Sequence, residues 1–164
     1  MKVLSMKKNI IAALVACSVG YAGVSSAHDA GATLSSISDV DGIIKSVVGL
    51  ATVDCFDDGS GAADNLIVSI RDNSPPVPGL MVNVQVVSSK GNKVNSITDT
   101  VSGDADFSSS IALQDGKGPY SVIVNKTDVG DRSFDLIYHC FTADSVHTGT
   151  DIHVFQFGLP KVTP

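Results

Sequence analysis

The stretch from residue 65 to residue 71 reads Asn-Leu-Ile-Val-Ser-Ile-Arg, and it decides the fold class. Leu66, Val68 and Ile70 alternate with residues of the opposite face, which is the period of a β-strand with one buried face. The run from Asp72 to Gly79 follows directly and contains X-Pro pairs, which disfavour helical backbone before each proline. The stretch therefore predicts a strand that ends in a turn.

The same alternation recurs to the end of the chain, between turns rich in Gly, Asp and Asn. The further alternating segments are Met81–Val86, Val94–Thr98, Phe107–Leu113, Tyr120–Val124, Phe134–Cys140 and Ile152–Phe157. All seventeen acidic residues are Asp, which prefers turns, and none is Glu, which prefers helix interiors. We predict an all-β fold, a single antiparallel β-sandwich of about seven or eight strands, immunoglobulin-like or jelly-roll-like.

The segment from Ser36 to Ala51 has apolar residues at helical spacing. Alternation resumes after it and ends at Phe56. We expect a strand from about Val47 to Phe56, preceded by a loop or one short helix. The domain organisation expected is an N-terminal segment at 28–46, partly loop or short helix, and a β-sandwich domain at 47–164.

Residues 1–27 are predicted to be a signal peptide. Lys7 and Lys8 precede the apolar run Ile10–Ala16, and the small residues Ser25–Ala27 form a site of the kind that signal peptidases cut. The apolar run is too short to cross a membrane. Cleavage after Ala27 makes His28 the first mature residue of an exported protein, either periplasmic or extracellular.

A competing cleavage site stays open. The sequence Leu14–Cys17 resembles the lipobox of bacterial lipoproteins, in which the cysteine is lipidated and becomes the first residue. Both interpretations place the protein outside the cytoplasm. Lipid anchoring through Cys17 would leave His28 without a free α-amine, whereas cleavage after Ala27 creates one.

The size and charge of the mature chain restrict its partners. Removal of 27 residues from 164 leaves 137, enough for one domain with a core, and the three lysines lost take the formal net charge from −6 to −9. A chain this acidic has no electrostatic attraction to nucleic acid. We expect a protein or cell-envelope partner and no transmembrane segment in the mature chain.

Two cysteines remain after cleavage, Cys55 and Cys140. An even pair in an oxidising compartment predicts a disulfide. With only two cysteines, the pairing has no alternative.

The run Gly118–Val124 followed by Phe134–Tyr138 resembles the closing hairpin of bacterial pre-peptidase C-terminal and related immunoglobulin-like domains. In that family a Gly-x-Tyr-x-Val-x-Val strand turns back into an aromatic-x-Leu-x-aromatic strand. Tyr138, two residues before Cys140, is also similar to the tyrosine corner of immunoglobulin domains. The resemblance implies a β-sandwich that serves as a non-catalytic accessory of a secreted protein.

The sequence does not predict an enzyme. The absence of Glu excludes the zincin helix motif and Glu-based glycosidase pairs. A nucleophile elbow, a Walker loop and a dinucleotide fingerprint are also absent from the sequence, and no spacing of Ser and His singles out a catalytic triad.

An Asp-rich loop offers oxygen ligands of the kind calcium prefers, from Asp54, Asp57, Asp58 and Asp64. The loop departs from the EF-hand spacing, because it lacks the final bidentate Glu. The alternative is an ordinary turn, in which Asp side chains accept backbone hydrogen bonds and Gly adopts the backbone conformation that the turn requires.

The four histidines all lie in the mature chain, as His28, His139, His147 and His153. An N-terminal histidine binds copper through its amine and imidazole together, and imidazole suits copper. Asp151 with His153 forms an Asp-x-His element similar to that of periplasmic copper-carrier proteins, whose site also uses an N-terminal histidine. These five residues are the candidate copper ligands, and surface histidines near a strand end are the alternative.

We therefore expect an exported, non-catalytic β-sandwich module with a binding or structural role at the cell envelope or outside the cell. The alternative function is that of a mononuclear copper-binding protein, which would use His28 and the C-terminal histidine cluster.

Overall fold

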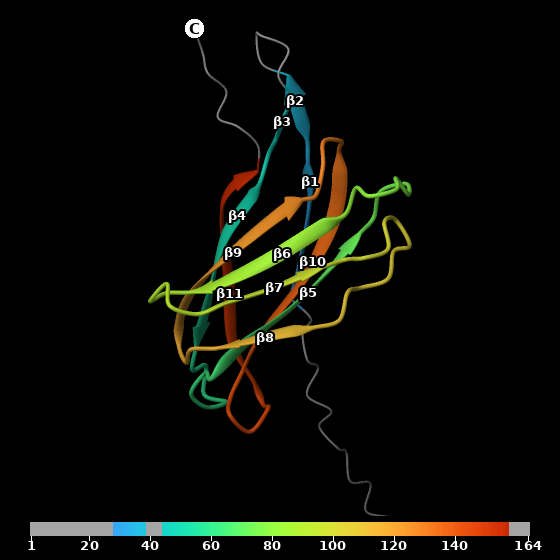
Figure 1. Cartoon of the computed structure of the whole chain (residues 1–164). Coiled ribbons are helices and arrows are strands. Elements are labelled where there is room, and N and C mark those ends of the chain that lie inside the picture. Colours follow the sequence, from blue (N-terminus) through green and yellow to red (C-terminus); the bar gives the residue numbers. More distant parts are fainter. Residues whose placement is uncertain (1–27, 39–43, 158–164) are drawn as a thin grey trace, which may run out of the picture.

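A computed structural model describes residues 28–38 and 44–157 (Figure 1). The predicted signal peptide, including Cys17, and the C-terminal residues 158–164 lie outside the described residues. Over the two described ranges, the chain contains no apolar helix of membrane-spanning length.

All regular elements in the described ranges are β-strands, which confirms the all-β class. They are β1 (Asp29–Leu34), β2 (Ser36–Ser38), β3 (Ile44–Ser46), β4 (Gly49–Phe56), β5 (Asn65–Asp72), β6 (Val82–Ser88), β7 (Val94–Thr98), β8 (Ile111–Gln114), β9 (Gly118–Lys126), β10 (Arg132–Phe141) and β11 (His147–Phe157). The strands β5, β6, β7, β9 and β10 match their predicted segments closely. The strand β8 is shorter than predicted and β11 is longer.

Nine of the strands form one antiparallel sheet in the order β7-β6-β9-β4-β11-β10-β5-β8, with β1 paired to β10. The sheet curls until its end strands approach, and the Asn95 side-chain amide of β7 donates to the Ala112 carbonyl of β8 at 3.0 Å. The result is an antiparallel sheet nearly closed into a barrel (Figure 1). The two-layer sandwich expected from the sequence stays a prediction.

The N-terminal part of the chain differs from the expectation of a loop or one short helix. Residues 36–38 and 44–46 form the antiparallel pair β2–β3, and residues 39–43 lie outside the described residues. Strand pairing prevails over the helical spacing here because the apolar positions are β-branched, which favours strands. The strand β1 was not identified from the sequence, and it extends the sheet back to Asp29, ahead of the expected boundary at residue 47.

The core lies inside the curled sheet and is formed by alternate residues of its strands. Its most deeply buried apolar members include Leu34, Val53, Leu66, Ile70, Val82, Val84, Tyr120 and Val122. Val53, Leu66, Ile70, Val82, Val84, Tyr120 and Val122 occupy the inward positions that the period of two requires.

The predicted disulfide between Cys55 and Cys140 is confirmed. It joins β4 to β10 within the core, with the two Cα atoms 5.5 Å apart and the two cysteines 85 positions apart in sequence. Both cysteines are buried. Because the closed loop is long, the cross-link removes much conformational freedom from the unfolded chain.

Replacing both cysteines, as Cys55→Ala with Cys140→Ala, should lower the free energy of unfolding by about 4 kcal/mol. Urea unfolding of the mature protein, followed by circular dichroism, measures the change. Wild type treated with a reductant and an alkylating agent should lose a similar amount. Unchanged unfolding midpoints would show that the disulfide does not stabilise this fold.

Candidate metal centre

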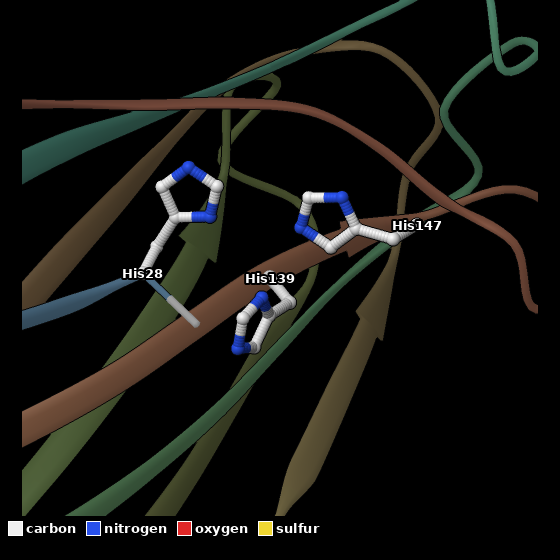
Figure 2. A group of neighbouring side chains, drawn as sticks. All are labelled: His28, His139 and His147. Atoms are coloured by element: carbon white, nitrogen blue, oxygen red, sulfur yellow. The ribbon is translucent and has the colours of Figure 1, made fainter. Parts of the chain in front are cut away.

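Three of the five predicted copper ligands lie together in the structure: His28, His139 and His147. Each offers one ring nitrogen, and these three nitrogens lie within 4.8 Å of one another. Figure 2 shows the three rings around a common space, with the His28 and His147 rings facing each other across it. They form the only cluster of three or more potential metal ligands found within residues 28–38 and 44–157.

The pleat of β10 turns His139 away from the core. Tyr138 and Cys140, its neighbours in sequence, are both buried, and consecutive strand residues point to opposite faces. Phe141 shares the outer face with His139 and lies opposite His147 of β11 in the strand register. The β10–β11 hairpin therefore brings two histidines to the same patch of the outer surface.

His28 reaches the same patch from the other end of the chain. Tyr138 donates its backbone N–H to the His28 carbonyl at 3.1 Å, and the ladder of β1 with β10 begins one residue later, at Asp29 opposite Ile137. The strands β1 and β11 thus pair with the same edge of β10, one after the other. The three histidines surround the point where the two strands meet.

Ring contacts hold the three imidazoles against one another. The His28 and His147 rings are stacked, with centroids 5.4 Å apart and planes only 3° from parallel. The His139 ring meets the His147 ring edge-on at 5.2 Å. Phe141 packs edge-on against His147 at 5.8 Å and forms an apolar side of the cluster.

One nitrogen of each ring is buried and has no hydrogen-bond partner: Nδ1 of His28, Nδ1 of His139 and Nε2 of His147. Among the described residues, six buried side-chain nitrogen or oxygen atoms lack a partner, so this cluster accounts for half of them. Leaving a buried polar atom unsatisfied costs roughly 1–3 kcal/mol. A metal ion shared by the three nitrogens would satisfy all of them at once.

Burial lowers the pKa of the His139 imidazole below its usual value, and the neighbouring His147 and His28 lower this pKa further. The neutral form of His139 is therefore favoured. A histidine must be neutral at the coordinating nitrogen to bind a metal, so the environment of His139 favours the form that can act as a ligand.

The set of donors fits a late first-row transition metal. Three imidazoles without a carboxylate suit copper, zinc or nickel, whereas calcium and magnesium require oxygen ligands. Metal–nitrogen bonds of about 2.0–2.1 Å place two opposite ligands about 4.2 Å apart. The three nitrogens, which lie within 4.8 Å of one another, are close to this spacing.

The other two predicted copper ligands, Asp151 and His153, lie elsewhere on β11. His153 Nε2 is 3.4 Å from a carboxylate oxygen of Asp54 and 3.5 Å from one of Asp151. A strand rises about 3.3 Å per residue, so six residues separate His153 from His147 by about 20 Å. Asp151 and His153 therefore do not belong to the histidine cluster, which corrects their prediction as ligands of one site. They form a separate group with Asp54 on β4 and β11.

The four candidate calcium ligands do not converge on a common point. Asp57 accepts hydrogen bonds from the backbone of Gly59 and Gly61, and Asp58 accepts one from Ser60, as in ordinary Asp turns. Asp64 accepts from the side chains of Gln114 and Asn65. Asp54 is the residue paired with His153.

A comparison of the chain with family models, curated proteins and solved structures found no match.

Phe141 is a residue of the site that the sequence analysis did not identify. The alternating pattern of β10 could have identified it, because Phe141 occupies the same face as His139 in that pattern. The approach of His28 to this face depends on the pairing of β1 with β10, which local sequence does not reveal.

The pKa shift of His139 predicts a pH dependence of stability for the metal-free protein. Because the folded state lowers this pKa, the unfolded state binds more protons near pH 6.5 and stability decreases as the pH falls through that range. Urea unfolding at pH 7.5 and pH 5.5 should show a smaller free energy of unfolding at the lower pH. The loss should be reduced in His139→Gln and retained in the control His153→Gln; the same loss in all three proteins would contradict the assignment.

Proposed function

We propose that the mature protein is an exported, non-catalytic copper-binding protein whose site is formed by His28, His139 and His147. The observation that carries this proposal is that three buried ring nitrogens, one from each histidine, have no hydrogen-bond partner and lie close together. The three histidines come from separate places in the chain: the residue before β1, the strand β10 and the start of β11. A structural role for the histidines would place hydrogen-bond partners on these atoms, as native proteins do for most buried polar groups.

Copper is the metal that this ligand set favours. For a given nitrogen site, affinity rises along the first-row divalent ions to a maximum at Cu(II) and falls at Zn(II). Both cysteines predicted to remain after cleavage are held in the disulfide, so thiolate ligands do not compete with the imidazoles. The proposed role is to hold or carry copper outside the cytoplasm.

Cleavage after Ala27 would add a fourth ligand, the α-amine of His28. The buried nitrogen of this residue is Nδ1, the ring nitrogen closer to its own main chain, so the amine and Nδ1 can chelate one ion together. An α-amine has a pKa of about 7.7–8.0, well below that of a lysine, and can lose its proton to bind a metal near neutral pH.

Replacing any one of the three histidines should weaken Cu(II) binding by at least about tenfold, because one strong ligand is lost. Competitive titration of the untagged mature protein against a chelator of known affinity measures the change for His28→Ala, His139→Ala and His147→Ala. The matched control His153→Ala should bind as wild type does. Equal binding by all four variants, or a loss confined to His153→Ala, would refute the proposed site.

The contribution of the α-amine is tested separately with two chains that differ by one acetyl group. The first has a free amine at His28, and in the second an acetyl group converts this amine into an amide but keeps all three imidazoles. The first should bind Cu(II) at least about tenfold more tightly. Equal affinities would exclude the amine as a ligand and leave the three-histidine site in place.

A further inference from the structure

The strand β1 is joined to the sheet along one edge. It pairs with β10 alone among the described strands, so its other edge carries no backbone ladder (Figure 1). Ala30, Gly31 and Ala32 form its middle, and Ala and Gly have weak strand propensity. An edge strand of this composition is suited to open locally while the rest of the sheet stays folded.

The inner side of β1 packs loosely against the core. Ala30 lines an apolar cavity of about 10 Å³, together with Phe134 and Leu136 of β10, Ile152 of β11 and residues of β4 and β9. Ala30 and its neighbour in the inward row, Ala32, are both only partly buried. Side chains beside a gap lose the contacts that a larger residue would supply. Packing therefore holds the first half of β1 only weakly.

The C-terminal end of β1 is tied to the connection between β9 and β10. Lys126 Nζ donates to the Leu34 carbonyl at 3.0 Å and to the Ser36 hydroxyl at 2.8 Å. Asp131 accepts the backbone N–H of Ser36 at 2.7 Å. The Leu34 side chain is fully buried. This end of the strand is therefore fixed by hydrogen bonds and by packing.

The contacts of the N-terminal end centre on His28. Tyr138 donates its backbone N–H to the His28 carbonyl. The His28 ring lies 5.9 Å from the Tyr138 ring, 5.8 Å from the His139 ring and 5.4 Å from the His147 ring, measured between centroids. Its buried Nδ1 has no hydrogen-bond partner. The hold on this end of β1 is thus weaker than the hold on the other.

The other two histidines of the cluster belong to a part of the sheet that is fixed. His139 is next to Cys140, whose disulfide cross-links β10 to β4. His147 is the first residue of β11 and pairs with Phe141 of β10. A metal ion bound to all three histidines would join this fixed hairpin to His28, and through His28 to the end of β1 that is held weakly.

We propose that copper controls the docking of β1: the bound ion fastens the N-terminal half of the strand to β10 and β11, and without the ion this half opens away from the sheet. The inference rests on the copper site proposed above and adds its regulation. Opening removes His28 from the site, so the open form binds copper more weakly, by the factor of at least about tenfold expected for His28→Ala. By linkage, copper lowers the ratio of open to closed protein by the same factor.

Opening of β1 uncovers an edge of β10. Because Tyr138 and His28 form a hydrogen-bonded pair of the ladder, the next such pair is Leu136 with Ala30. The freed edge is able to accept an extended segment of a partner, with small side chains at the positions that Ala30 and Ala32 vacate. Such a partner displaces His28 and weakens copper binding, and bound copper in turn excludes the partner.

Hydrogen exchange of the mature protein, followed by mass spectrometry of peptide fragments, tests the proposal. Without metal, the fragment that contains β1 should exchange faster than the fragment that contains β6, because local opening is sufficient. Saturating Cu(II) should slow exchange in β1 by at least about tenfold. In His28→Ala, Cu(II) should leave exchange in β1 unchanged. The matched control His153→Ala should respond to Cu(II) as wild type does.

The outcomes separate this proposal from the copper site on which it rests. Cu(II) binding without slower exchange in β1 would overturn the control of docking and leave the copper site in place. Equal slowing in β1 and β6 would overturn it as well, because copper would then act only on global unfolding. Slowing in β1 that persists in His28→Ala would show that His28 is not the link. A lack of Cu(II) binding in the competitive titration would overturn both proposals.

Discussion

One edge of β10 is shared by two strands, and the candidate metal site depends on this pairing. β1 pairs with Arg132 to Ile137 and β11 pairs with Cys140 and Phe141, so His139 lies where one partner ends and the other begins. His28 and His147 therefore approach His139 from two directions, and residues that are more than a hundred positions apart in sequence meet at one point.

Strand β10 carries both a cysteine of the buried disulfide and a histidine of the surface cluster, because consecutive residues of a strand point to opposite faces. Cys140 forms the buried disulfide, and His139 points outward beside it. Burial of the His139 ring is unfavourable for its protonated form and lowers its pKa, and the neighbouring His147 and His28 lower this pKa further. One nitrogen of each of the three rings is buried and has no hydrogen-bond partner within the protein, and the copper ion proposed above would bind these nitrogens.

The local signals in the sequence predicted most of the sheet and part of the site. Alternation identified β5, β6, β9 and β10 because their apolar residues occupy every second position. It did not identify β1, whose Ala and Gly residues have weak strand propensity and which is held in place by pairing with β10. Histidine chemistry named five candidate ligands, and the structure brings three of them together, His28, His139 and His147. Asp151 and His153 lie apart from these three, because proximity in sequence does not bring residues together along an extended strand.

The incomplete closure of the sheet has a cost that the chain offsets with particular side chains. An open strand edge invites pairing with other chains, and proteins protect such edges with lysine or with inserted side-chain hydrogen bonds. Lys93 and Asn95 do this between β7 and β8, where their side chains donate hydrogen bonds to two carbonyls of β8.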